Sequence, residues 1–199
     1  MGVSIFPPPP AGANDAERER AVIETGVLDA KGDPALLAIC MEACQLVSGT
    51  ASLLSVLYGE TQYVIAAHGF TMGAYGRKHS LSGHALAAGS DLFVVPDLSM
   101  DERFSENPWV NGEVARFRYY VASLIRPWNR YPVAAISVLD TAARVSITSF
   151  EQQTMLAAAE KAAARIMQIS REGLSHKPTA PLDSRAVSQV IPAYPVVRT

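Results

Sequence analysis

Apolar residues recur at helical spacing in two long stretches of the chain, residues 33–48 and 148–170. In the first stretch, Asp33 is a good N-cap, Pro34 suits the first helical position and Gly49 suits the end. Its apolar positions are Leu36, Leu37, Cys40, Ala43, Cys44 and Val47. Those of the second stretch are Phe150, Met155, Leu156, Ala159, Ala163, Ile166 and Ile169. Both patterns predict amphipathic helices that bury one side.

Two further features refine the helical pattern. Thr148 and Glu151 have the spacing of a capping box, which predicts that the last helix begins there. A charged stretch over residues 15–25 that ends near Gly26 predicts a first, shorter helix.

The middle of the chain is typical of β-strands. Residues 51–58 and 62–67 are rich in β-formers and flank a turn, so they predict an antiparallel hairpin. Short strands are expected at 93–95, 119–125 and 133–139. Both faces of these strands are apolar, so both faces need cover. The pattern predicts an α+β fold with an antiparallel sheet of five or six strands. The terminal helices would pack on one face, and the loop-rich residues 69–118 would cover the other.

Composition divides the chain into three zones. Residues 1–15 hold four consecutive prolines and predict a flexible segment, residues 16–171 predict one folded domain, and residues 172–199 predict a flexible tail. The tail also carries Val190, Ile191 and Tyr194, so a docking peptide is the alternative to plain disorder.

Charge and cysteine usage exclude several classes of function. The net charge is only −2, which argues against nucleic acid or an anionic membrane as the main partner. The two cysteines, Cys40 and Cys44, lie one helical turn apart, and the four histidines are scattered. Two thiols supply only half a metal site, so we expect buried, reduced, structural thiols and no metal. Reduced thiols favour a cytoplasmic location.

Several short motifs together resemble the GAF sensor family over residues 17 to about 165. The most specific part is Val94-Val95-Pro96-Asp97 followed by Asp101-Glu102-Arg103-Phe104 and Asn107-Pro108. Weaker matches occur, in the family's order, at residues 24–29, 52–62, 80–85, 116–120 and 138–140. The resemblance implies a sheet with helices on one face and a ligand pocket on the other, walled by residues 69–118. It also implies a homodimer through the terminal helices and a signalling protein as partner.

The resemblance and the residue chemistry together predict a pocket border. The expected residues are Ser80, Ser82, His84, Phe93, Asp97 and Tyr120. Each has a structural alternative: His84 can bond to backbone, Asp97 can cap a turn, and the aromatic residues can pack in the core. Ser82 stands where bilin-binding members carry a cysteine, so a covalent bilin would lack its nucleophile. The cyclic-nucleotide signature of the family is not found, and the cofactor remains unknown.

The resulting hypothesis is a sensor or regulatory domain that binds a small molecule or a protein and acts in trans. No arrangement of residues supports catalysis, so we expect no enzyme activity. Two alternatives stay open. One is a thiol-dependent enzyme resembling free methionine sulfoxide reductases, which would use Cys40 and Cys44; the other is a ligand-free scaffold for protein interaction.

Overall fold

An antiparallel sheet of six strands, in the order β3-β2-β1-β6-β5-β4, runs through the centre of the molecule. The computed structural model describes residues 6–129 and 131–176. The strands are β1 (Ala51–Tyr58), β2 (Thr61–His68), β3 (Gly73–Gly76), β4 (Leu92–Val95), β5 (Tyr119–Ile125) and β6 (Ala134–Asp140). The predicted hairpin is β1–β2, the strands expected at 119–125 and 133–139 pair as β5–β6, and the α+β fold is confirmed.

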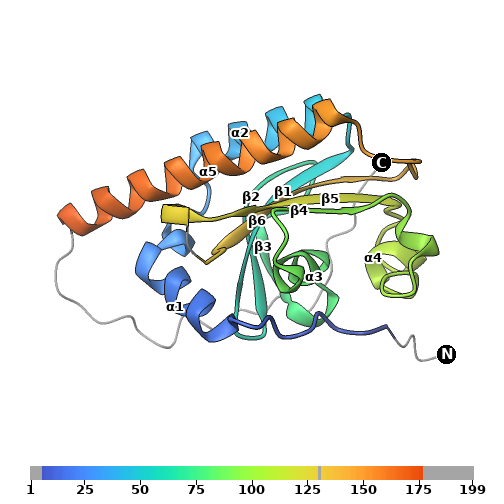
Figure 1. The fold of residues 1–199 in the computed structure, drawn as a ribbon, viewed down its shortest axis with the longest axis horizontal. Coiled ribbons are helices and arrows are strands. Elements are labelled where there is room, and N and C mark those ends of the chain that lie inside the picture. Colours follow the sequence, from blue (N-terminus) through green and yellow to red (C-terminus); the bar gives the residue numbers. More distant parts are fainter. Residues whose placement is uncertain (1–5, 130, 177–199) are drawn as a thin grey trace.

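Two helices, α2 (Pro34–Leu46) and α5 (Ser149–His176), lie side by side on one face of this sheet (Figure 1). An ion pair joins them, because Arg165 of α5 reaches the N-cap of α2 with its guanidinium 2.6 Å from the Asp33 carboxylate. The Asp33 side chain also accepts from the backbone N–H of Leu36 at 3.1 Å, as an N-cap does. The prediction that these two helices share one face is therefore confirmed.

The long helix α5 begins at the predicted capping box. The backbone N–H of Thr148 donates to Glu151, and that of Glu151 donates back to the Thr148 hydroxyl at 3.2 Å. Its small and apolar stripe, including Met155, Ala159 and Ile166, is buried in the core of the same chain. The stripe is thus accounted for by packing within one chain, and it does not require a second copy to cover it.

The opposite face of the sheet is covered by short elements. They are the 3-10 turns η2 (Arg77–His79) and η3 (Leu98–Met100) and the helices α3 (Leu81–Ala88) and α4 (Pro108–Asn111). Figure 1 shows α3 and α4 below the strands and α2 and α5 above them. This segment, expected to be mostly loops, also contains edge strand β3. A four-residue strand with glycine at both ends gives almost no apolar alternation, which explains why the pattern did not predict it.

The N-terminal residues differ from the expectation of a flexible segment over 1–15. Residues 6–14 run beneath α3 and lead into α1 (Asp15–Thr25), as the blue trace in Figure 1 shows. Pro9 is buried there. At the other end, α5 continues to His176, past the predicted boundary at 171. The predicted flexible tail from residue 177 onward lies outside the described residues.

Two further 3-10 turns lie in the connections between the larger elements. The 3-10 turn η1 (Val27–Ala30) joins α1 to α2, and η4 (Pro127–Asn129) begins the connection from β5 to β6. Within the described residues, no helix combines the length and the apolar character that crossing a membrane requires.

Candidate functional site

A small cavity of about 30 Å³ lies between the sheet and the elements on the α3 side. Five aromatic side chains form much of its wall: Phe70, Tyr75, Trp109, Phe117 and Tyr120. Four polar side chains also line it: Gln62, His79, Ser82 and Ser137. Such a volume holds about two water molecules, so the cavity is small in this structure.

The period-2 alternation of the central strands decides which residues reach the cavity. On β5, Tyr120 faces the cavity, whereas Tyr119 belongs to the core beneath α2 and α5. The Tyr120 hydroxyl is within 3.2 Å of the Ser82 hydroxyl of α3. A hydrogen bond to Ser137 of β6 also acts on it, yet burial dominates and raises the pKa of Tyr120 to about 12. The cavity floor is therefore polar, neutral and fixed by three hydroxyl groups.

The outer wall of the cavity is a cluster of three rings from separate segments. The ring centres of Phe70 and Trp109 lie 5.2 Å apart, those of Phe70 and Tyr75 5.7 Å, and those of Tyr75 and Trp109 5.9 Å. Asn107 holds this wall together, because its side chain accepts from the Trp109 N–H at 3.0 Å and donates to the His79 carbonyl at 3.2 Å. Tilted and edge contacts of this kind stabilise aromatic pairs beyond their buried area.

The lining carries no formal charge at neutral pH. No Asp, Glu, Lys or Arg from the described part of the chain lines the cavity. His79 does line it, and burial, with help from the neighbouring Lys78, lowers the pKa of its imidazole below the ordinary value. An apolar wall with a few neutral polar groups suits an uncharged ligand, because a buried charge would find no counter-ion here.

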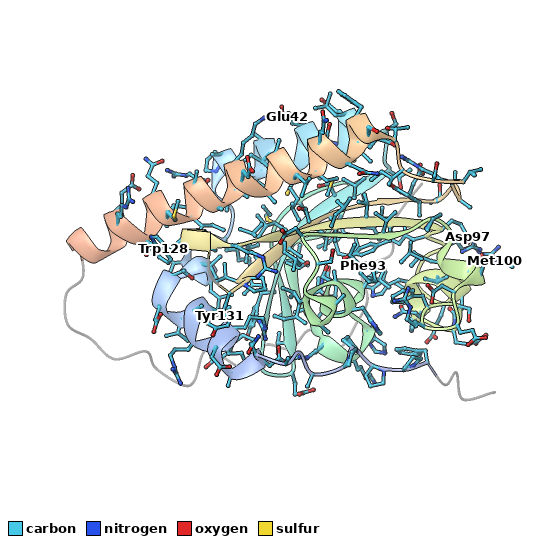
Figure 2. The ribbon with its side chains drawn as sticks, in the orientation of Figure 1. Glu42, Phe93, Asp97, Met100, Trp128 and Tyr131 are labelled. Atoms are coloured by element: carbon cyan, nitrogen blue, oxygen red, sulfur yellow. The ribbon has the colours of Figure 1, made fainter. Side chains whose placement is uncertain are left out.

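Two of the six residues expected at the pocket border, Ser82 and Tyr120, line this cavity. Ser80 instead caps α3, and its hydroxyl accepts from the Gly83 N–H at 2.9 Å. Asp97 caps η3 and accepts from the Ser99 N–H at 2.9 Å. Figure 2 shows Asp97 near the exposed Met100 at one end of the molecule. The structure therefore gives Ser80 and Asp97 local backbone partners, and neither residue lines the cavity.

His84 and Phe93 pack beside the cavity without lining it. The His84 ring meets Phe104 edge-on at 4.8 Å, and Phe93 lies 6.2 Å from Tyr120. Burial lowers the pKa of His84 to about 4, and the Arg103 charge adds to this effect. A hydrogen bond to the backbone of Pro7 and the charge of Asp101 act in the opposite direction. His84 is consequently a neutral, packed imidazole at neutral pH.

Most of the lining was not among the residues that the sequence analysis singled out. Gln62 and Ser137 lie on the cavity-side positions of β2 and β6, so strand alternation carried a signal for them. Phe70, Tyr75 and His79 come from a segment without apolar periodicity, and only the fold brings them together.

Both thiols lie in the core on the other side of the sheet. Cys40 and Cys44 of α2 are free and buried, as predicted. Burial raises the pKa of Cys40 to about 12 and also raises that of Cys44. Among the described residues, no group of three or more His, Cys, Asp or Glu side chains is placed to hold a metal ion.

Comparison with solved structures identifies this architecture. The chain superposes on the GAF domain of a phosphoenolpyruvate-protein phosphotransferase from Coxiella burnetii with a TM-score of 0.58 and 12% identity. The match covers 80% of this chain and 96% of that one. The chain has a GAF fold. No family model matches the sequence.

Other similar structures come from proteins with different activities. The chromophore-binding domain of the bacteriophytochrome RpBphP3 from R. palustris matches with a TM-score of 0.55 and 14% identity, over 82% of this chain and 65% of that one. A type II free methionine-R-sulfoxide reductase from Thermoplasma acidophilum matches with a TM-score of 0.52 and 10% identity, over 76% and 95%. At such identities, the likeness establishes the fold alone.

One curated relative is similar in sequence. It is a cyclic di-GMP phosphodiesterase of Pseudomonas aeruginosa, 26% identical over 132 residues, or 66% of this chain. The matched part spans 22% of the length of that relative.

Proposed function

We propose that this chain is a sensor or regulatory domain that binds a small, uncharged, flat molecule in the aromatic cavity between the sheet and α3. The observation that carries the proposal is the lining itself. Phe70, Tyr75 and Trp109 offer ring faces, and the hydroxyls of Ser82, Tyr120 and Ser137 offer neutral hydrogen-bonding groups on the floor. A few convergent polar groups in an apolar pocket are typical of small-molecule sites.

The thiol-enzyme alternative finds no support in the position of the cysteines. The sequence holds two cysteines, and both lie in the core beneath α2, with the sheet between them and the cavity. A thiol whose pKa is about 12, as in Cys40, is almost entirely protonated at neutral pH and is a poor nucleophile. We therefore propose a binding domain rather than an enzyme.

Output would pass through the helices on the opposite face. The outer surfaces of α2 and α5 expose Met41, Leu46 and Phe150 at 43%, 44% and 59%, which supports a protein contact there. We propose that this surface binds a second copy or a signalling protein in the cytoplasm. Light scattering at micromolar concentration tests the homodimer: a dimer that Leu46→Glu dissociates is expected, and a monomer contradicts it.

The sequence relative suggests the pathway. Its phosphodiesterase activity supports a proposed role for this domain in regulating the level of cyclic di-GMP. Loss of the chain in its native host is then expected to change cellular cyclic di-GMP, and an unchanged level contradicts this role.

Native mass spectrometry of protein purified gently from its native host tests the ligand-binding proposal. We expect a retained adduct whose mass is that of a small organic molecule and that leaves the protein on unfolding. A protein that carries no adduct, and gains none from a metabolite extract of that host, would support the ligand-free scaffold instead.

A further inference from the structure

We propose that residues 6–12, named the strap below, hold the α3 wall of the cavity in place, and that a ligand enters when the strap leaves α3. The proposal rests on the cavity being the ligand site, as proposed above, and it concerns how access to that site is controlled. The strap was expected to be flexible, yet it contacts η2 and α3 along its length.

The strap follows one side of η2 and α3. Its Phe6 ring lies 5.3 Å from the His79 ring, and Pro9 packs against Gly83. Gly12 approaches the helix at Ala87, whose Cα would be 3.7 Å from a Cβ built on Gly12. His79, Gly83 and Ala87 are four residues apart, the spacing of residues on one side of a helix. The strap therefore contacts η2 and α3 at three successive positions.

The closest of these contacts is that between Pro9 and Gly83. A Cβ at this position would lie 2.6 and 2.7 Å from two carbons of the Pro9 ring and 3.1 Å from the Leu57 side chain. Contacts below 3 Å are too close for real Cβ atoms, and a pyrrolidine ring has little freedom to move aside. A side chain at position 83 would therefore collide with Pro9, so the close packing of this buried proline on α3 requires glycine there.

The strap reaches the cavity wall through His79. No residue of the strap lines the cavity itself, but His79, Leu81 and Ser82 do, and the Phe6 ring packs against the His79 ring. A space of about 30 Å³ holds about two water molecules, so a larger ligand needs a wall to move.

Among the covering segments, the strap is suited to move. Its prolines at 7–10 have no N–H groups to donate, so they contribute no ladder of backbone hydrogen bonds. The hydrogen bond between His84 and the Pro7 backbone is a polar contact that would have to break. We infer that displacing the strap uncovers His79 and opens the cavity toward solvent.

Fluorescence quenching by acrylamide, a small neutral amide, tests this without a known ligand. The chain has two tryptophans: Trp109 lines the cavity at 8% exposure, whereas Trp128 is 48% exposed and distant from the α4 end (Figure 2). In a Trp128→Phe background, the signal comes from Trp109 alone. Gly83→Ala should expel Pro9 and raise the quenching constant several-fold. Gly173→Ala, with nothing within 4 Å of its Cβ position, is the matched control and should not change it.

Hydrogen exchange at the Asp15 amide, which donates to the Gly12 carbonyl of the strap at 3.2 Å, reports whether the strap has left α3. Faster exchange together with stronger quenching supports the proposal. Faster exchange with unchanged quenching overturns it, because the strap then does not hold the cavity wall. Unchanged exchange in folded Gly83→Ala also overturns it, because glycine at position 83 is then not needed for the strap to pack on α3.

A second variant covers the case in which Gly83→Ala does not fold. Phe6→Ala removes the ring that covers His79 without adding a clash, and it should raise Trp109 quenching less than Gly83→Ala but above the control. Quenching equal to the control overturns the proposal. A protein that shows the strap effect but never binds a ligand contradicts the proposed function and leaves the strap intact.

Discussion

Acidification should destabilise the protein through one buried imidazole, His84. Its side chain is 7% exposed and its pKa is lowered to about 4 from the ordinary 6.5. Between these values the unfolded chain binds a proton at His84 and the folded chain does not. The free energy of unfolding therefore falls as the pH drops from about 6.5 to about 4, and this contribution is fully present above 6.5. A shift of this size corresponds to about 3 kcal/mol.

Urea denaturation at several pH values between 7.5 and 4 measures this loss, and His84→Gln serves as the reference. Glutamine keeps a polar side chain but does not titrate, so the difference between the two proteins isolates His84 from His79, whose pKa is also lowered. We expect the wild type to lose about 3 kcal/mol more than the variant over this range. Parallel curves would refute the burial of a neutral imidazole.

The same reasoning separates a packed histidine from one at a pocket rim. His84 lies against Phe104 and bonds to the backbone of Pro7, so His84→Ala should lower stability by about 2–3 kcal/mol at pH 7. A loss of about 1 kcal/mol or less, together with weaker ligand binding, would indicate that His84 belongs to the binding site.

Three further predictions concern the scaffold. Cys40 should react slowly with a thiol reagent in the native state and rapidly in urea, because its thiol is buried and its pKa is about 12; fast native labelling would contradict this. Arg18→Ala should lower the unfolding free energy by about 3 kcal/mol, because the buried guanidinium donates to the Leu57 carbonyl at 2.6 Å. A loss under about 1 kcal/mol, measured by urea denaturation, would argue against that role. Thr148→Ala should cost about 1 kcal/mol by removing the cap of α5, whereas Thr148→Ser should cost little.

The sheet and its helices were predictable because their signals are local. Runs of β-forming residues marked β1, β2, β5 and β6, and the caps at Asp33 and Thr148 placed the starts of α2 and α5 within a residue. The four-residue strand β3 gave too little pattern to be found, since only its pairing with β2 makes it a strand.

The site was less predictable because it forms from contacts between distant segments. Ser82 and Tyr120 were expected, but the wall joins Trp109 to Phe70 and Tyr75, which come from a separate segment earlier in the chain. The strap shows the same difficulty. Four prolines indicate an extended chain, yet only the close approach of Pro9 to Gly83 shows where that chain packs.

A matched pair of serine variants tests the central claim, that a ligand occupies the aromatic cavity. Ser137 and Ser52 are buried on the neighbouring strands β6 and β1. Ser137 lines the cavity, whereas Ser52 lies on the α2 side, beside Cys40. Valine at either position adds a methyl branch and removes a hydroxyl, so both changes alter packing in a similar way. The measurement is the occupancy of the retained adduct in native mass spectra of the two variants. The account predicts that Ser137→Val loses the adduct and Ser52→Val keeps it; equal occupancy in both would contradict a ligand site in this cavity.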